Sequence, residues 1–102
     1  MQEADTFGGA TPYETLEMYI SAIEKGDFAL ASKYFVIENQ EKELASWADM
    51  SSESIQKNID LLKQAQKIEG SYSMDEKAFS ILRPIFVDFY LYPKGIWKIT
   101  EI

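Results

Sequence analysis

The spacing of apolar residues changes at Gly70, and this change constrains the fold more than any other feature of the sequence. Before Gly70, apolar residues such as Leu16, Ile20 and Ile23 recur every three or four positions, which is the spacing of amphipathic helices. After Gly70 the chain is rich in Tyr, Phe, Ile and Val, which favour strands. Four helices followed by strands predict an α+β domain rather than an alternating α/β one.

The start of the first helix is marked by three residues. Thr11 suits the N-cap, Pro12 suits the first helical position, and Glu14 completes a capping box three residues after the cap. Gly26 favours the end of this helix, because glycine adopts the left-handed conformation without a Cβ clash. Asp27 is then expected to cap the second helix directly, so the first two helices form a helical hairpin.

Pro93, Lys94 and Gly95 predict a three-residue hairpin loop, in which Gly95 takes the left-handed position. A two-residue loop would set Asp88 opposite Glu101, and like charges directly opposite are unfavourable. The three-residue loop is therefore favoured. It pairs Tyr92 with Ile96, Leu91 with Trp97, Tyr90 with Lys98, Phe89 with Ile99 and Asp88 with Thr100. Residues 71–82 are expected to hold one or two further strands, with a turn or bulge near residues 75–77.

This register gives the hairpin one core face and one unusually apolar second face. The core face carries Val87, Phe89, Leu91, Trp97 and Ile99. The second face carries Phe86, Asp88, Tyr90, Tyr92 and Ile96, followed by Lys98, Thr100 and Ile102. Solvent-facing strand faces are usually more polar, so we expect another subunit, a neighbouring strand or a ligand to cover part of it. The first five residues of the second face are the candidate interface.

The composition excludes several chemistries. The chain has no Cys and no His, which removes thiol nucleophiles, disulfides, Cys/His zinc sites and His-dependent triads. A net charge of −7 argues against nucleic acid as a partner, and no apolar run is long enough for direct membrane insertion. Glu41, Glu43, Asp75 and Glu76 match no calcium loop and are expected to be solvated. We therefore expect no catalytic residue, no metal and no cofactor.

Residues 1–10 are expected to form a flexible leader before a single domain over residues 11–102. They are polar, contain a Gly pair and show no periodicity. They also lack the basic and apolar stretches of a secretory signal. Two alternatives stay open: a natural leader, or the cut end of a longer protein whose signal or anchor is not among these residues.

Two stretches carry a resemblance to a known superfamily. The run TPYETLEMYISAIEKGDFALASKYF (residues 11–35) and the segment GIWKI (residues 95–99) resemble the nuclear-transport-factor-2-like, cystatin-like α+β superfamily, in particular its small bacterial members of unknown function. The matching parts cover about half the chain and are packing and turn signatures. The resemblance implies N-terminal helices packed on one face of a curved antiparallel sheet of three to four strands. It also implies a pocket between the first helix and the sheet, and a location outside the cytoplasmic membrane behind a signal or anchor.

The sequence leaves more than one function open. The first hypothesis is a non-enzymatic binding or accessory domain, homodimeric through its sheet or bound to a protein partner. The alternative is a small-molecule-binding protein or acid–base enzyme whose pocket is lined by Tyr19, Tyr34, Trp47 and Trp97. Asp88 would act as a base only if it faced a dry pocket, whereas the register places it on the outer face. A third hypothesis is an acidic helical surface that meets a basic partner.

Overall fold

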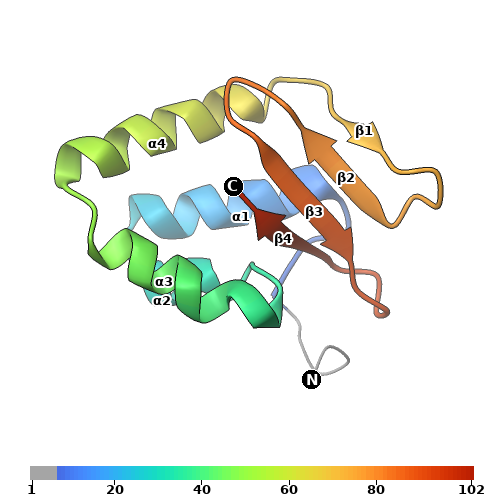
Figure 1. The fold of residues 1–102 in the computed structure, drawn as a ribbon, viewed down its shortest axis with the longest axis horizontal. Helices are drawn as coiled ribbons and strands as arrows, with labels where there is room; N and C mark the ends of the chain where they lie inside the picture. The colour runs from blue at the N-terminus through green and yellow to red at the C-terminus, as the bar shows by residue number, and fades with distance from the viewer. Residues whose placement is uncertain (1–6) are drawn as a thin grey trace.

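The computed structural model describes residues 7–102, in which helices precede a single sheet (Figure 1). The helical elements are α1 (Pro12–Glu24), α2 (Phe28–Ser32), the short 3-10 helix η2 (Ile37–Asn39), α3 (Gln40–Ala48) and α4 (Ser52–Ala65). The strands are β1 (Ser71–Tyr72), β2 (Ala78–Ile81), β3 (Val87–Leu91) and β4 (Trp97–Glu101). They form an open antiparallel sheet in the order β1-β2-β3-β4. The α+β class and the order of helices before strands are confirmed.

The local signals at the start and end of α1 have the predicted geometry. The Glu14 backbone N–H donates to Thr11 Oγ1 at 3.2 Å, and the Thr11 N–H donates to Glu14 Oε2 at 3.0 Å. Gly26 has a φ of 75°, and the Leu30 N–H donates to Asp27 Oδ1 at 3.1 Å at the start of α2. The corner between the two helices therefore follows from residues that are adjacent in the sequence.

The hairpin of β3 and β4 has the predicted three-residue loop. Gly95 has a φ of 88°, and its N–H donates to the Tyr92 carbonyl at 2.9 Å. The Tyr92 N–H in turn donates to the Ile96 carbonyl at 2.8 Å. The expected pairs Leu91–Trp97, Tyr90–Lys98 and Phe89–Ile99 are confirmed. A turn over residues 73–77 separates β1 from β2, as expected.

The prediction that Asp88 pairs with Thr100 is wrong. Asp88 lies opposite Glu101, because the register shifts between Asp88 and Phe89 and leaves Thr100 as an extra residue on β4. The Asp88 carboxylate accepts a hydrogen bond from the Ser80 hydroxyl at 2.7 Å, which gives it a partner on β2. A one-residue bulge of this kind keeps the rest of the register while it changes the pairing at one end.

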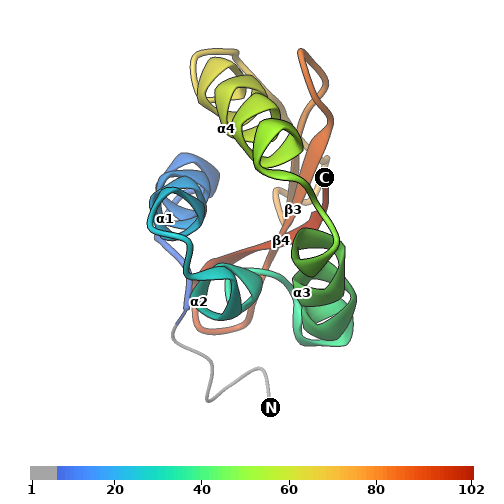
Figure 2. The same ribbon diagram turned by 90° about the vertical axis from the view of Figure 1, so that its left-hand side faces the viewer.

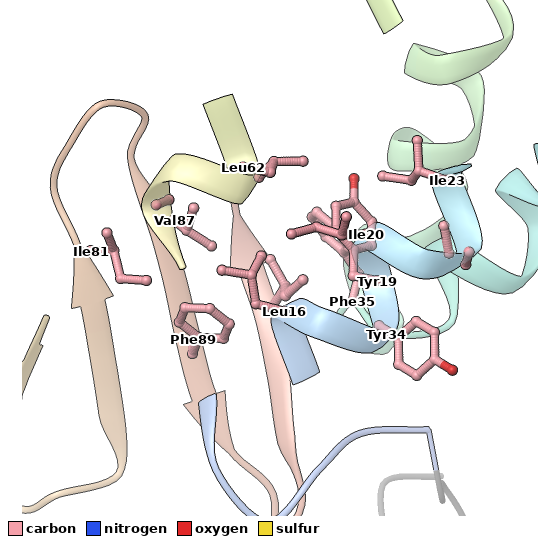
Figure 3. Close-up of a cluster of buried hydrophobic side chains, with 14 of the residues drawn as sticks. Leu16, Tyr19, Ile20, Ile23, Tyr34, Phe35, Leu62, Ile81, Val87 and Phe89 are labelled. Atoms are coloured by element: carbon pink, nitrogen blue, oxygen red, sulfur yellow. The ribbon is translucent and has the colours of Figure 1, made fainter. Parts of the chain in front are cut away.

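The apolar core forms between the sheet and the two longest helices. Figure 2 shows α1 and α4 on one side of the sheet. Leu16 of α1 and Leu62 of α4 are fully buried near Val87 and Phe89 of β3 (Figure 3). Other buried apolar residues include Ile20, Ile23, Ile59, Ala65, Phe79, Ile81 and Ile99.

The edge of β4 that faces away from β3 is covered by the segment after α2. Phe35 forms a parallel bridge with Ile99. The Ile99 N–H donates to the Tyr34 carbonyl and the Val36 N–H donates to the Ile99 carbonyl, each at 2.8 Å. This pairing brings the start of α3 beside the C-terminal half of β4.

Part of the apolar second face of the hairpin is covered by the chain itself. Tyr92 and Lys98 are 1% and 0% exposed. The Ile37 N–H donates to the Tyr92 hydroxyl at 3.0 Å, and Lys98 Nζ donates to the carbonyls of Phe7 and Lys33. The expected cover was another subunit, a neighbouring strand or a ligand. For these two residues the cover comes instead from the same chain, through the connection between α2 and α3 and through Phe7.

The described part of the expected leader, residues 7–10, contacts the domain. The Trp97 N–H donates to the Gly9 carbonyl and the Gly9 N–H donates to Thr15 Oγ1, each at 2.9 Å. The Phe7 ring meets the Tyr34 ring edge-on at 6.2 Å. Residues 1–6, the rest of the expected leader, lie outside the described residues. Over residues 7–102, no helix combines the length and apolarity needed to cross a membrane.

Candidate binding site at Glu43

Three side chains from two helices meet in a hydrogen-bonded group, here called the Glu43 network. The Tyr19 hydroxyl of α1 donates to Glu43 Oε2 of α3 at 2.5 Å. Trp47 Nε1 of α3 donates to the Tyr19 hydroxyl at 2.9 Å and to the same Glu43 oxygen at 3.1 Å. The network therefore joins α1 to α3 through the carboxyl group of Glu43.

The helices place these side chains together for simple reasons. Glu43 and Trp47 are four residues apart, so they share one face of α3. Trp47 stacks on Phe28 of α2, with ring centroids 5.5 Å apart and planes 4° from parallel. Tyr19 belongs to the buried stripe of α1 and is 0% exposed. Because Trp47 packs between the helices, Glu43 on the same helix face lies half-buried beside it.

The burial of this network changes the acidity of both titratable groups. Loss of water raises the pKa of the Glu43 carboxyl above its ordinary value of 4.5, although the hydrogen bonds from Tyr19 and Trp47 act in the opposite direction. Burial, and then the nearby Glu43 carboxylate, raise the pKa of the Tyr19 hydroxyl. Tyr19 therefore stays protonated and acts as a donor to Glu43.

Glu43 also borders an open cleft of about 170 Å³ between α3 and the end of β4. Its lining residues are Phe35, Asn39, Lys42, Glu43, Ser46, Thr100, Glu101 and Ile102. Both hydrogen bonds to the Glu43 carboxyl use Oε2, and no hydrogen bond to Oε1 is formed within residues 7–102. One oxygen is thus held from inside the protein, and the other has no donor.

The bulge in β4 shapes the opposite wall of this cleft. Thr100 is the extra residue of the bulge, and its carbonyl accepts a hydrogen bond from Asn39 Nδ2 at 2.7 Å. The Thr100 hydroxyl oxygen is buried and has no hydrogen-bond partner among the described residues. Bulges are common beside functional sites because they redirect a side chain locally.

The predicted pocket residues fall into three places. Tyr19 and Trp47 come together in the Glu43 network. Tyr34 lines a second open cleft, of about 240 Å³, between α1 and α2. Trp97 lines neither cleft; it is buried, and its carbonyl accepts a hydrogen bond from Thr15 Oγ1 at 2.8 Å. Neither cleft lies between α1 and the sheet.

The candidate interface residues also differ in accessibility. Phe86 and Tyr90 are 39% and 41% exposed, so they are available on the outer face. Asp88 and Ile96 are half-buried, and Tyr92 is buried within its own chain.

Glu43, expected to be a solvated helix residue, is half-buried and accepts two hydrogen bonds, because Trp47 on the same helix face docks into the protein. The spacing of four residues indicates only that Glu43 shares a helix face with Trp47, whereas its burial depends on the contact of Trp47 with Phe28. The sequence does not point to Asn39 and Thr100 as site residues either. Their contact depends on the bulge, for which the local sequence carries no clear sign.

The site is not arranged to hold a metal ion. Across residues 7–102, no group of three or more His, Cys, Asp or Glu side chains is placed to ligate one.

Comparison with protein-family models, with curated proteins and with solved structures found no match.

Proposed function

We propose that this chain is a non-enzymatic binding domain and that the cleft beside Glu43 binds a small molecule. The observation that carries the proposal is the position of the Glu43 carboxyl. Tyr19 and Trp47 hold one oxygen from inside, and the other oxygen, at an open cleft, has no donor within residues 7–102. A carboxyl that loses water costs free energy, and an apolar residue would avoid that cost. The presence of a carboxyl at this costly position is better explained by contact with a ligand than by a contribution to stability.

The cleft limits the size of the ligand. Its volume of about 170 Å³ is below the roughly 300–1,000 Å³ of pockets that hold drug-sized molecules. At about 30 Å³ for each water molecule, it has room for roughly five or six heavy atoms. The proposed ligand is therefore a small polar compound, or one small group of a larger compound.

We further propose that the chain is a nuclear-transport-factor-2-like protein. The support is the sequence resemblance of its first two helices and its last hairpin, together with the order of helices before an antiparallel sheet. Relatives of that superfamily include non-catalytic accessory domains, which agrees with a binding role.

The two tryptophans make the proposal testable by NMR. The indole N–H of Trp47 lies in the Glu43 network, and Trp97 is buried elsewhere as an internal control. Small polar fragments of each charge class are titrated while both indole signals are followed. We expect some fragments to move the Trp47 signal, to leave the Trp97 signal in place, and to lose this effect in Glu43→Gln.

Glu41→Gln is the matched control, because it makes the same change on an exposed position of the same helix. It should leave fragment binding unchanged. If no fragment moves the Trp47 signal, or if Glu43→Gln binds as well as Glu41→Gln, the proposed site is wrong.

A second candidate function is a homodimer formed through the outer face of the sheet. The exposure of Phe86 and Tyr90 favours it. Sedimentation equilibrium over a range of concentrations would detect a dimer, and Tyr90→Glu should dissociate it. A strict monomer at high protein concentration would exclude this candidate.

A further inference from the structure

We propose that the ligand bound at Glu43 contributes a primary ammonium group. This inference rests on the proposed function and adds the chemistry of the ligand. It follows from the hydrogen-bonding groups that the cleft leaves unused, and from the charges of its lining residues.

Lys42 and Ser46 of the lining are exposed and can be hydrated, so the unused groups that matter are those of the half-buried lining residues Asn39, Glu43 and Thr100. The hydroxyl of Tyr19 and the indole N–H of Trp47 both already donate to Glu43 Oε2. Asn39 Nδ2 donates to the carbonyl of Thr100. Among the described residues, Glu43 Oε1 has no donor and the buried Thr100 Oγ1 has no partner. Both oxygens can accept a hydrogen bond, so a ligand that brings N–H or O–H groups fits them.

The charges of the lining favour a cation over a neutral donor. Glu43 and Glu101 are acidic and Lys42 is the one basic residue of the lining. A hydrogen bond from an ammonium to a carboxylate is about twice as strong as one between neutral groups. A metal ion would need more ligating side chains than the described residues bring together. An organic ammonium carries its own N–H donors, so it does not need several ligating side chains.

The walls of the cleft suit a short alkyl stem behind such a group. Phe35 and Ile102 contribute apolar surface, and the volume of about 170 Å³ matches a four-carbon amine. The same chemistry occurs in a free alkylamine and in the side chain of a lysine on another protein. The probes therefore have to separate these two sources.

The test follows the Trp47 indole signal at neutral pH with n-butylammonium, n-butanol, butyrate and tetramethylammonium as probes. We expect n-butylammonium to give a saturable shift of Trp47 but not of Trp97. The neutral alcohol, the anion and the cation without N–H donors should give no shift. A short blocked peptide that contains lysine is the fifth probe, and binding at least tenfold tighter than n-butylammonium would identify a protein side chain as the source.

Two variants give effects of opposite sign. Glu43→Gln removes the charged acceptor and should weaken n-butylammonium binding by about tenfold or more. Lys42→Gln removes the competing cation from an exposed position and should strengthen binding by about two- to fivefold. The gain in Lys42→Gln cannot arise from poor folding of the variant.

Two outcomes would overturn the inference. If butyrate or n-butanol moves the Trp47 signal and n-butylammonium does not, the cleft binds a ligand but not an ammonium, so the proposed function survives without it. If n-butylammonium binds equally well to Glu43→Gln and to the unmodified protein, the group is not recognised by Glu43.

Discussion

Replacement of Tyr19 by Phe isolates the contribution of the Glu43 network to stability. The phenylalanine ring keeps the packing of Tyr19 against Phe35 and Trp47, whose ring centroids lie 5.6 and 6.5 Å away. The change removes the hydroxyl that donates to Glu43 Oε2 at 2.5 Å and accepts from Trp47 Nε1 at 2.9 Å. Trp47 still donates to the Glu43 carboxyl, so that group keeps one donor.

The structure also supplies a matched control on the same helix. The Tyr13 hydroxyl donates to the Ile68 carbonyl at 2.7 Å and accepts from the Gly70 N–H at 3.0 Å. Each tyrosine thus donates one hydrogen bond and accepts one, but only Tyr19 donates to a carboxyl group. Hydrogen bonds to charged groups contribute about 1.5–3 kcal/mol, against about 0.5–1.5 kcal/mol for neutral ones.

We therefore expect Tyr19→Phe to lower the free energy of unfolding by about 2 kcal/mol and Tyr13→Phe to lower it by about 1 kcal/mol. For a domain of this size, these losses correspond to a fall in melting temperature of roughly 10 °C and 5 °C. Urea denaturation at neutral pH, followed by circular dichroism, measures the free energy of unfolding of both variants. If Tyr19→Phe costs no more than Tyr13→Phe, the hydroxyl of Tyr19 does not support a charged Glu43.

Two further predictions concern Glu43 and the hairpin loop. Because the pKa of Glu43 is raised, the folded protein binds the proton of the Glu43 carboxyl more tightly than the unfolded chain does. The contribution of Glu43 to stability therefore falls as the pH rises from about 4.5 through the pKa of the folded state. Glu43→Gln should remove this part of the pH dependence in urea denaturation, whereas Glu41→Gln should retain it. Gly95→Ala should lower the free energy of unfolding by about 1–2 kcal/mol, because Gly95 has a φ of 88°. Gly95→Asn should cost less, since asparagine tolerates that conformation, and equal losses in thermal melts would contradict this reason.

The parts of the fold that could be predicted depend on residues close together in the sequence. The capping box of Thr11 and Glu14 marks the start of α1, and Gly95 marks the last turn. In each case, one or two residues determine the local backbone, and no distant contact is needed. The order of helices and strands follows from periodicity in the same way.

The candidate site could be predicted only in part. The sequence predicts that Tyr19 and Trp47 line a pocket, but it predicts a solvated Glu43, because acidic residues on helices are usually solvated. Its burial depends on the docking of Trp47 against Phe28, which lies nineteen positions earlier in the chain. The bulge at Thr100 likewise depends on how β4 meets the segment that contains Asn39. Periodicity within one strand does not reveal such contacts.

The central claim is that α1 and α3 hold the Glu43 carboxyl partly withdrawn from water beside the cleft. A pH titration of the Glu43 side-chain carboxyl carbon by NMR, with the Trp47 indole signal followed in parallel, tests this claim most directly. We expect a midpoint above 4.5 for the carboxyl and a shift of the Trp47 signal with the same midpoint. A midpoint at or below 4.5, with a Trp47 signal that does not respond, would show that Glu43 is a solvated helix residue.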